Sequence, residues 1–492
     1  MNSYKKIAKS SGLIASAQIL KMAFSMVRNK VIAIALGTFG FGIWGLYQTL
    51  IEIIYNFSLL GVDKSGVREI AIIESKNKKE INETTQVLQI LIWILSIVTF
   101  ATCLFFSKTI SQSLFQSDKY SSGIMIVSVV FLFKGAATCN STILNGLQLL
   151  KPLASSQILG AAIGTCSVIT LVYSVGLSGI PYFLLLIAIS EWLTSYYFLR
   201  KNYKISPNIP FDVFKKKYQI FFKVGFGFFI AAIVAAASTY LARTFLLKEY
   251  NLESLGIYQA SWNISNLYIG IILSAMGVDF MPRLTKSITQ KDKASSLINE
   301  QMEFGTLLAS FGIAFILIFS KTIITLLYSD AFQEATEIIR WQAFGVFFRV
   351  IGFPLSYAIM AKKKSYHYIA VQIIFWVSDY LLLVLISNTL GFKFLGLNYF
   401  FSYIIYLLLA GTVTYKLVNF KPSKLLIKIF TISSCFLVLS FIISFLLTGL
   451  PHLFAGVLTL IALLLWMNYY FKKYMNINAM SKLNELITSI KK

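Results

Sequence analysis

The chain is dominated by long apolar segments that recur from one end to the other. A helix needs about 20 predominantly apolar residues to cross the hydrocarbon core of a bilayer, and each of these segments reaches that length. Since a helix satisfies its backbone hydrogen bonds internally, it is the natural spanning element. The sequence therefore predicts an all-α polytopic membrane protein with about 14 transmembrane helices. We expect them at residues 10–36, 42–68, 84–107, 121–147, 153–175, 180–199, 218–246, 255–281, 301–327, 338–361, 367–390, 396–416, 425–447 and 453–471.

Composition excludes the common soluble classes. Hydrophobic residues make up 57% of the chain and charged residues only 13%, which is too little polar surface for a soluble enzyme, a disordered protein or a secreted scaffold. The net charge of +24 comes from cations between apolar segments rather than from a basic face, so no nucleic-acid partner is expected. His367 and His452 are far apart in sequence, and we expect neither a metal site nor a cofactor.

The cations also predict orientation. If both termini are cytoplasmic, the cytoplasmic connections hold 31 Lys and Arg residues and the opposite ones hold six. Such a bias in short loops is a strong topological signal. The sequence thus predicts a multi-pass protein of the bacterial cytoplasmic (inner) membrane with both termini in the cytoplasm.

The chain repeats itself at an offset near 215 residues. Arg243 matches Arg28 and Phe348-Arg349 matches Phe133-Lys134, while Phe106–Ile110 recurs as Phe319–Ile323. Gly45-Leu46-Tyr47-Gln48 likewise returns as Gly256-Ile257-Tyr258-Gln259. Two six-helix bundles with one topology are expected to be related by a two-fold axis along the membrane normal, with the substrate path between them. The predicted organisation is an N-terminal bundle with a basic linker at 1–215, a C-terminal bundle at 216–424, a helix pair at 425–472, and a cytoplasmic tail with an amphipathic pattern at 473–492.

Cations inside the predicted spans need a reason, since a charge at the bilayer centre costs at least about 2.5–3.5 kcal/mol. Lys134 and Arg349 are repeat equivalents, as are Arg28 and Arg243. Lys21 shares a polar helix face with Arg28. We interpret these five residues as the lining of a basic cavity for an anionic ligand such as a diphosphate, which arginine binds through its fork of donors. The alternative is that Lys21 snorkels to the interface and the others pair with acids or helix carbonyls.

Three acids also fall within spans: Glu52, Glu191 and Asp379. Gln48, Glu52 and Asn56 share one helix face, so Glu52 is the favoured candidate for H⁺ or Na⁺ coupling, with Asp379 second. Glu52 could equally be the static partner of Arg28. Glu191 is expected near the cytoplasmic end of its helix, where water would solvate it.

Two stretches carry a family resemblance, together with Leu144-Asn145-Gly146-Leu147. They are Leu36-Gly37-Thr38-Phe39-Gly40-Phe41-Gly42-Ile43-Trp44-Gly45-Leu46-Tyr47-Gln48 and Leu60-Gly61-Val62-Asp63-Lys64-Ser65-Gly66-Val67-Arg68-Glu69-Ile70-Ala71. The chain resembles the Wzx-type oligosaccharide flippases, which are polysaccharide-export members of the multidrug/oligosaccharidyl-lipid/polysaccharide (MATE-like) superfamily. Arg28 also resembles the helix 1 arginine of the lipid II flippase, although Asn29 stands where that family usually has an acid.

The resemblance implies two six-helix bundles and alternating access. Its cargo would be an undecaprenyl-diphosphate-linked oligosaccharide repeat unit, moved to the periplasmic leaflet for O-antigen, lipopolysaccharide or another surface polysaccharide. Membrane lipid, a polysaccharide polymerase and a chain-length regulator are the implied partners, and no catalysis is implied.

Two other functions stay open. A MATE-type drug or cation antiporter would need acids for its cationic cargo, whereas the predicted cavity is mostly basic. A membrane polysaccharide polymerase or glycosyltransferase would need acid–base groups or metal ligands, often in a large external loop. The external connections predicted here are short.

Overall fold

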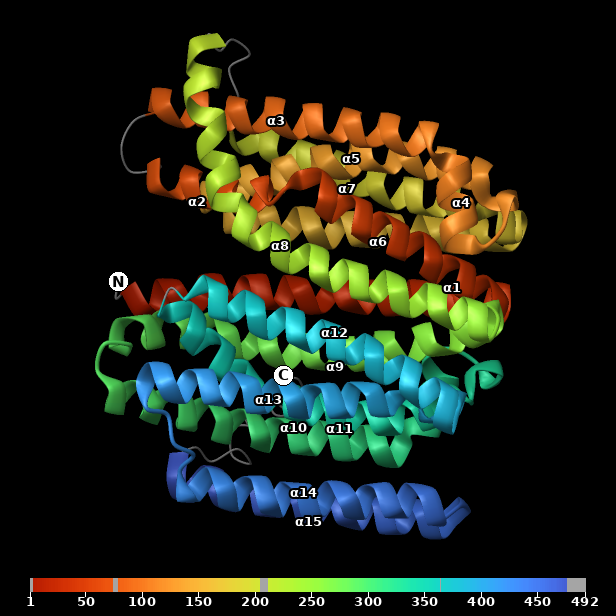
Figure 1. Ribbon diagram of the computed structural model, residues 1–492, viewed down its shortest axis with the longest axis vertical. Helices are drawn as coiled ribbons and strands as arrows, with labels where there is room; N and C mark the ends of the chain where they lie inside the picture. Colours follow the sequence, from red (N-terminus) through yellow and green to blue (C-terminus); the bar gives the residue numbers. More distant parts are fainter. Residues whose placement is uncertain (1–2, 74–77, 204–210, 363, 476–492) are drawn as a thin grey trace, which may run out of the picture. The chain divides into compact units, whose positions relative to one another are not determined.

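The computed structural model describes residues 3–73, 78–203, 211–362 and 364–475, and every regular element within these ranges is helical (Figure 1). The first helices are α1 (Ser3–Leu59), α2 (Val62–Ile73), α3 (Lys78–Phe105), α4 (Ser107–Phe115), α5 (Ser121–Gly146), α6 (Leu150–Val175) and α7 (Ile180–Asn202). They are followed by α8 (Phe211–Glu249), α9 (Leu252–Ser287), α10 (Lys291–Leu327), α11 (Ala335–Ala361), α12 (Ser365–Leu390), α13 (Gly396–Val418), α14 (Lys424–Leu446) and α15 (Gly449–Met475). Short 3₁₀ turns occupy Asp118–Tyr120, Gly176–Gly179, Asp330–Phe332 and Phe392–Phe394.

The prediction of an all-α polytopic membrane protein is confirmed. Ten segments of the described chain are long and apolar enough to cross a membrane. Leu150–Asn202 contains two of the predicted spans, and Ser16–Leu59 overlaps two others. The spans predicted at 218–246 and 255–281 coincide with α8 and α9. Most of the predicted tail at 473–492 lies outside the described residues, as do Pro207 and Pro210 of the predicted linker.

Two glycines shape the first helices. Gly37 breaks the helical conformation inside α1 with φ 65° and ψ −170°, so α1 consists of two helical stretches that meet at a kink without a separate loop. The spans predicted at 10–36 and 42–68 begin on either side of this kink. The second of these predictions is wrong at its end, because Leu60 (φ 50°) and Gly61 (φ 74°) stop the helix and α2 starts afresh. A right-handed helix cannot continue through residues with positive φ.

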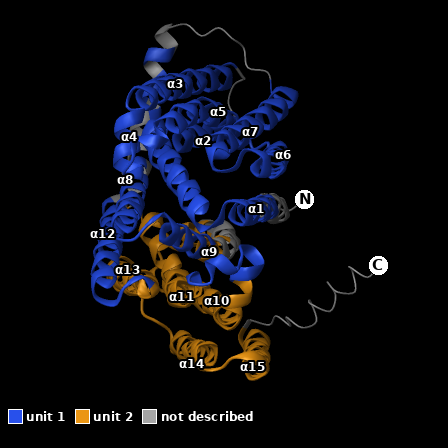
Figure 2. Cartoon of the chain, turned by 90° about the vertical axis from the view of Figure 1, so that its right-hand side faces the viewer, with its two compact units in different colours: residues 1–263, 324–335, 365–392 blue, residues 264–323, 336–364, 393–492 orange. Residues whose placement is uncertain are grey.

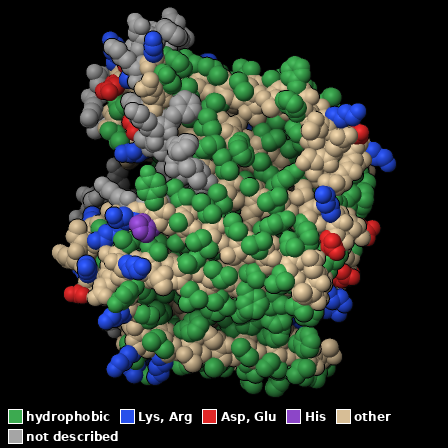
Figure 3. All heavy atoms as spheres, in the orientation of Figure 1, with side chains coloured by type: hydrophobic (Ala, Val, Ile, Leu, Met, Phe, Trp, Pro, Cys, Tyr) green, Lys and Arg blue, Asp and Glu red, His purple; other side chains and the backbone are tan. Residues whose placement is uncertain are grey.

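The surface is that of a protein surrounded by lipid. On the face shown in Figure 3, hydrophobic side chains cover the middle of the helices, and lysine and arginine side chains gather toward the helix ends. Leu408, Phe445 and Phe454 are among the large hydrophobic side chains that stay exposed along the last three helices. Exposed apolar side chains are stable in the hydrocarbon region, where no water surrounds them.

The chain divides into two compact units (Figure 2). The first unit contains residues 1–263, 324–335 and 365–392, and the second contains residues 264–323, 336–364 and 393–492. Helices α8 and α12 thus belong with α1–α7, where Ser238 Oγ of α8 donates a hydrogen bond to the Trp376 carbonyl of α12 at 3.0 Å. The predicted division into bundles at 1–215 and 216–424 follows the sequence repeat and stays a prediction.

Small residues bring helices of the first unit close together. A Cβ on Gly42 of α1 would lie 2.1 Å from the carbonyl oxygen of Leu252, and one on Gly256 of α9 would lie 2.0 Å from that of Thr38. This close approach is typical of membrane helices, which gain van der Waals contact by bringing their backbones together. A Cβ on Gly45 would lie 3.1 Å from the Gln259 side chain. The two copies of the repeated Gly-x-Tyr-Gln motif therefore pack against each other.

Candidate functional site

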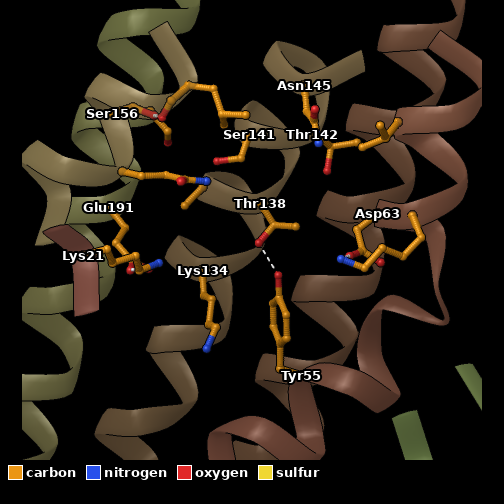
Figure 4. Close-up of a pocket in the computed structure, with 16 residues that line it drawn as sticks. Lys21, Tyr55, Asp63, Lys134, Thr138, Ser141, Thr142, Asn145, Ser156 and Glu191 are labelled. Atoms are coloured by element: carbon orange, nitrogen blue, oxygen red, sulfur yellow. Dashed lines mark hydrogen bonds and ion pairs between the residues drawn. The ribbon is translucent and has the colours of Figure 1, made fainter. Parts of the chain in front are cut away.

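Two adjoining cavities open within the first unit. The first, here named the Arg28 cavity, has a volume of about 490 Å³. The second, here named the Lys21 cavity, has a volume of about 570 Å³ (Figure 4). Tyr55, Lys134 and Glu191 belong to both linings, so the two cavities meet at these side chains. Volumes of this size are ordinary for binding sites of small molecules and headgroups.

The lining is rich in charge. The charged residues of the Arg28 cavity are Arg28, Glu52, Lys134, Glu191 and Arg243. Those of the Lys21 cavity are Lys21, Asp63, Lys64, Lys134 and Glu191. Together these are five cations and three carboxylates, so the joined space is basic. A low-dielectric wall strengthens the field of such a cluster on an anionic ligand.

Helix α1 supplies two of the cations, Lys21 and Arg28, from one face. Arg28 Nη2 donates a hydrogen bond to Ser25 Oγ at 3.1 Å, and the guanidinium carbon lies 6.0 Å from the centroid of the Trp44 ring. Arg28 Nε is buried and has no hydrogen-bond partner within the described part of the chain. Thr165 Oγ1 of α6 donates a hydrogen bond to the Phe24 carbonyl at 3.2 Å, which fixes this stretch of α1 against α6.

Lys134 stands between the two cavities on α5. Its Nζ lies 4.7 Å from the centroid of the Tyr55 ring, a cation–π arrangement. The Tyr55 hydroxyl in turn forms a hydrogen bond with Thr138 Oγ1, one turn along α5 (Figure 4). The tyrosine therefore holds the ammonium group in place without neutralising its charge.

Arg243 forms hydrogen bonds within the protein that a residue held ready only for ligand would not form. It is 5% exposed, and its Nη1 donates to the Gly45 carbonyl of α1 at 2.9 Å and to Thr49 Oγ1. Arg243 Nη1 is therefore paired with a helix carbonyl, which was the alternative to ligand binding that the sequence left open. The side chain nevertheless lines the Arg28 cavity. Arg243 both ties α8 to α1 and adds positive charge to the wall.

Arg349 belongs to the second unit and is not among the residues that line the two cavities. Its Nη1 donates to Tyr399 Oη at 2.7 Å and to Asn266 Oδ1 at 3.1 Å, and its guanidinium carbon lies 5.7 Å from the Tyr403 ring centroid. Like its repeat equivalent Lys134, it is a cation set over a tyrosine ring. The repeat is therefore visible in the local chemistry of both positions.

The acids lie in different surroundings. Glu52 is exposed toward the Arg28 cavity, and its carboxylate interacts electrostatically with Arg243 and Lys134. Asp379 is 4% exposed and borders a separate space of only about 10 Å³, which Arg243 also lines. A space of that size holds about one water molecule, so Asp379 is far less accessible to a ligand than Glu52.

The expectation that Glu191 is merely solvated is wrong. It lines both cavities, and its Oε1 lies 3.4 Å from Lys21 Nζ (Figure 4). Helix α7 brings it there because α6 packs closely on α7, with Gly160 placed so that a Cβ would lie 3.2 Å from the Glu191 Cα. The sequence signal that could have identified Glu191 is the scarcity of intramembrane acids available to balance the cations.

Amides and tryptophans form part of the remaining wall of the Arg28 cavity. The polar face predicted at Gln48, Glu52 and Asn56 lies there beside Gln259 and Asn263 of α9, since all of them contribute to one lining. Trp44 and Trp262 add aromatic surface. Amides supply both donors and acceptors, and aromatic rings supply apolar faces, a combination that suits hydroxyl-rich ligands.

Comparisons with known proteins agree with this arrangement. The chain is 21% identical over 392 residues to the lipid III flippase of Escherichia coli (strain K12), covering 78% of this chain and 91% of that protein. It also resembles the solved structure of the lipid II flippase MurJ in an inward closed conformation, with a TM-score of 0.73 at 16% identity, over 94% of this chain and all of that one. An inward-facing multidrug resistance MATE transporter of the MOP superfamily gives a TM-score of 0.71 at 14% identity, over 81% of this chain and 96% of that one.

These structural likenesses establish the fold, and a family match establishes the membership. The polysaccharide biosynthesis protein family matches residues 7–288, which is more than half of the chain. That stretch contains the helix signature from which the polysaccharide-export branch was predicted, and the prediction is confirmed. The chain belongs to the polysaccharide biosynthesis protein family.

Proposed function

We propose that this protein flips undecaprenyl-diphosphate-linked oligosaccharide repeat units from the cytoplasmic to the periplasmic leaflet by alternating access. The observation that carries the proposal is the basic pair of cavities lined by Lys21, Arg28, Lys134 and Arg243. A diphosphate carries one negative charge per phosphorus and offers several acceptor oxygens. Charge-assisted hydrogen bonds from lysine and arginine to such oxygens are among the strongest that a protein makes.

The sugar part of the cargo is assigned to the neighbouring amide and tryptophan wall. Sugar hydroxyls both donate and accept hydrogen bonds, which matches Gln48, Asn56 and Gln259. The relatives described as lipid II and lipid III flippases support a lipid-linked cargo for this chain as well. Arg349 of the second unit remains among the proposed diphosphate-binding residues on the strength of the repeat.

The biological setting follows from this assignment. We place the protein in the bacterial cytoplasmic membrane with both termini in the cytoplasm, in agreement with the distribution of its cations. It would supply repeat units to O-antigen, lipopolysaccharide or another surface polysaccharide, beside a polymerase and a chain-length regulator. In this role it moves cargo and is not an enzyme.

Reconstitution tests the proposal directly. Purified protein in proteoliposomes that contain undecaprenyl-diphosphate-linked oligosaccharide is expected to move the saccharide across the bilayer, as measured by its accessibility to an added lectin. Empty liposomes are the control. Transport of a cationic dye with no movement of the glycolipid would instead establish the MATE-type antiporter alternative.

Glu52→Gln tests ion coupling. The inside-negative potential already favours outward movement of the anionic cargo by about 2.3 kcal/mol per charge per 100 mV, so a coupled ion would act mainly in resetting the empty carrier. We therefore expect turnover to slow several-fold and the affinity for lipid-linked substrate to change little, both measured in proteoliposomes under imposed pH and Na⁺ gradients. Asp379→Asn is the comparison, and its smaller accessible space predicts a smaller effect. Unchanged turnover of Glu52→Gln across both gradients would remove Glu52 from the mechanism.

A further inference from the structure

We propose that Glu191 is an internal counterion that competes with the diphosphate of the cargo for Lys21, Arg28 and Lys134, and thereby sets how readily the cargo leaves. The inference rests on the proposed function, and it assigns a release role to a residue within that same site. Glu191 acts through the cations, so it is a positioning residue that does not itself bind the phosphate.

The position of Glu191 is the first argument. Its side chain borders both cavities, as does that of Lys134, whereas Lys21 borders one cavity and Arg28 the other. The carboxylate interacts electrostatically with all three cations. A diphosphate bound by these cations would have to occupy the space beside the carboxylate.

The geometry of the Lys21–Glu191 pair is the second argument. Lys21 Nζ and Glu191 Oε1 lie 3.4 Å apart, which is longer than the 2.7–2.9 Å of a tight charge-assisted hydrogen bond. The Lys21 and Glu191 side chains are 40% and 30% exposed, respectively. Lysine is a flexible, singly charged group that can turn from one acceptor to another without breaking a fixed fork of bonds. The pair is thus close enough to neutralise Lys21 and loose enough to be exchanged.

Helix packing and hydrogen bonds hold the backbone beneath the pair, so Lys21 can exchange partners through its side chain. Glu191 sits where α6 crosses α7 at Gly160, and Thr194 Oγ1, one turn further on, donates a hydrogen bond to the Ser190 carbonyl at 2.8 Å. On the other side, the Thr165 bond to the Phe24 carbonyl holds α1 between Lys21 and Arg28. Movement of Lys21 Nζ toward a phosphate therefore requires no helix displacement.

Charge balance is the third argument. The five cations and three carboxylates of the joined cavities leave two positive charges, which balance the two negative charges of a diphosphate diester. Removing the charge of Glu191 would leave three, and the cargo would then be held more tightly than its charge requires. Removing the charge of Lys21 alone would leave one positive charge, and removing the charges of Lys21 and Glu191 together would restore two.

This balance predicts a definite order of affinities. The probe is farnesyl diphosphate, titrated calorimetrically into the full chain in detergent micelles. As a monoester it carries about three negative charges near neutral pH, one more than the diester of the cargo, and it responds in the same order to the charge of the cavity. We expect Glu191→Gln to bind it about tenfold more tightly than the wild type, Lys21→Met to bind it about tenfold more weakly, and the double variant to bind it as the wild type does. In proteoliposomes Glu191→Gln is expected to lower both KM and kcat for the glycolipid, because release becomes slow. A purely structural defect would lower kcat without lowering KM.

Glu83→Gln is the matched control, since Glu83 also pairs with a lysine, Lys217, at 3.0 Å and has a similar exposure of 24%, but lines neither cavity. It is expected to leave the affinity unchanged. Affinity of Glu191→Gln equal to or below that of the wild type would overturn the inference. If Glu191→Gln does not fold, the variant that combines Lys21→Met with Glu191→Gln is decisive. An affinity for farnesyl diphosphate as low as that of Lys21→Met overturns the inference, and an affinity equal to that of the wild type supports it. A wild type that binds no farnesyl diphosphate and moves no glycolipid refutes the proposed function itself.

Discussion

Replacing Arg28 by Glu is expected to abolish flipping of the lipid-linked oligosaccharide while leaving the protein inserted in the membrane. Arg28 lines the cavity with its Nε unused within the described part of the chain, so its charge is available to the cargo. One pair of opposite charges about 4 Å apart contributes about 4 kcal/mol at an effective dielectric constant of ~20. Reversing the charge turns this attraction into repulsion, which corresponds to a loss of several orders of magnitude in affinity. Surface glycan in a complemented strain and glycolipid movement in proteoliposomes are the measurements.

Two variants control this experiment. Arg28→Lys keeps the charge but loses the fork of donors, and we expect a loss of about tenfold and no more. Lys248→Glu reverses an exposed charge at the end of α8, outside both cavity linings, and should retain normal flipping. Normal surface glycan from the Arg28→Glu protein would count directly against a diphosphate clamp at this position.

Replacing Gly42 by Leu is expected to prevent folding of the first unit. A side chain there would meet the Leu252 carbonyl oxygen at 2.1 Å, and a backbone oxygen in a helix cannot move aside. Helices α1 and α9 would have to separate, which would also pull apart the Gly45–Gln259 contact. Overpacking of a well-packed interface costs about 1–3 kcal/mol even for small additions, and four carbons exceed what the interface can accept. Gel filtration and thermal unfolding in detergent would show aggregated protein.

Gly411→Leu in α13 is the matched control, since a Cβ added at Gly411 would meet no atom of a neighbouring described residue within 4 Å. Its unfolding temperature should equal that of the wild type. Gly42→Ala is expected to fall between the two, with a lowered unfolding temperature and partial flipping activity. Wild-type stability of Gly42→Leu would show that α1 and α9 do not approach as closely as the structure has them.

The sequence was sufficient to predict the helices because the bilayer imposes a length on each of them. A run of about 20 apolar residues is readable without any tertiary information. Backbone breaks were only partly predictable: the break at Gly37 falls between two predicted spans, whereas the break at Leu60 and Gly61 falls inside a predicted span. Both breaks contain a glycine, but Gly40 and Gly42 lie within α1 without a positive φ, so glycine alone does not mark where a helix breaks.

The candidate site was predicted in part. The sequence repeat singled out Arg28, Lys134, Arg243 and Arg349, and the first three line one cavity, whereas Arg349 lines neither. The partners of these cations within the protein could not be predicted from the sequence. Arg243 donates a hydrogen bond to the Gly45 carbonyl, and Lys134 lies over the Tyr55 ring. These partners are separated from the cations by many residues in sequence, so only the packing of α5 and α8 against α1 brings them together.

The sequence by itself determined that the chain forms membrane-spanning helices and that their interior is basic, because hydropathy and charge are properties of single residues and of their periodicity. Only the tertiary structure decided which charges meet. Glu191 and Lys21 are 170 positions apart, and they become partners because Gly160 lets α6 lie against α7 while Thr165 ties α6 to α1. Since an electrostatic interaction depends on distance in space, a carboxylate that looks solvated in sequence becomes the counterion of the cavity in the folded protein.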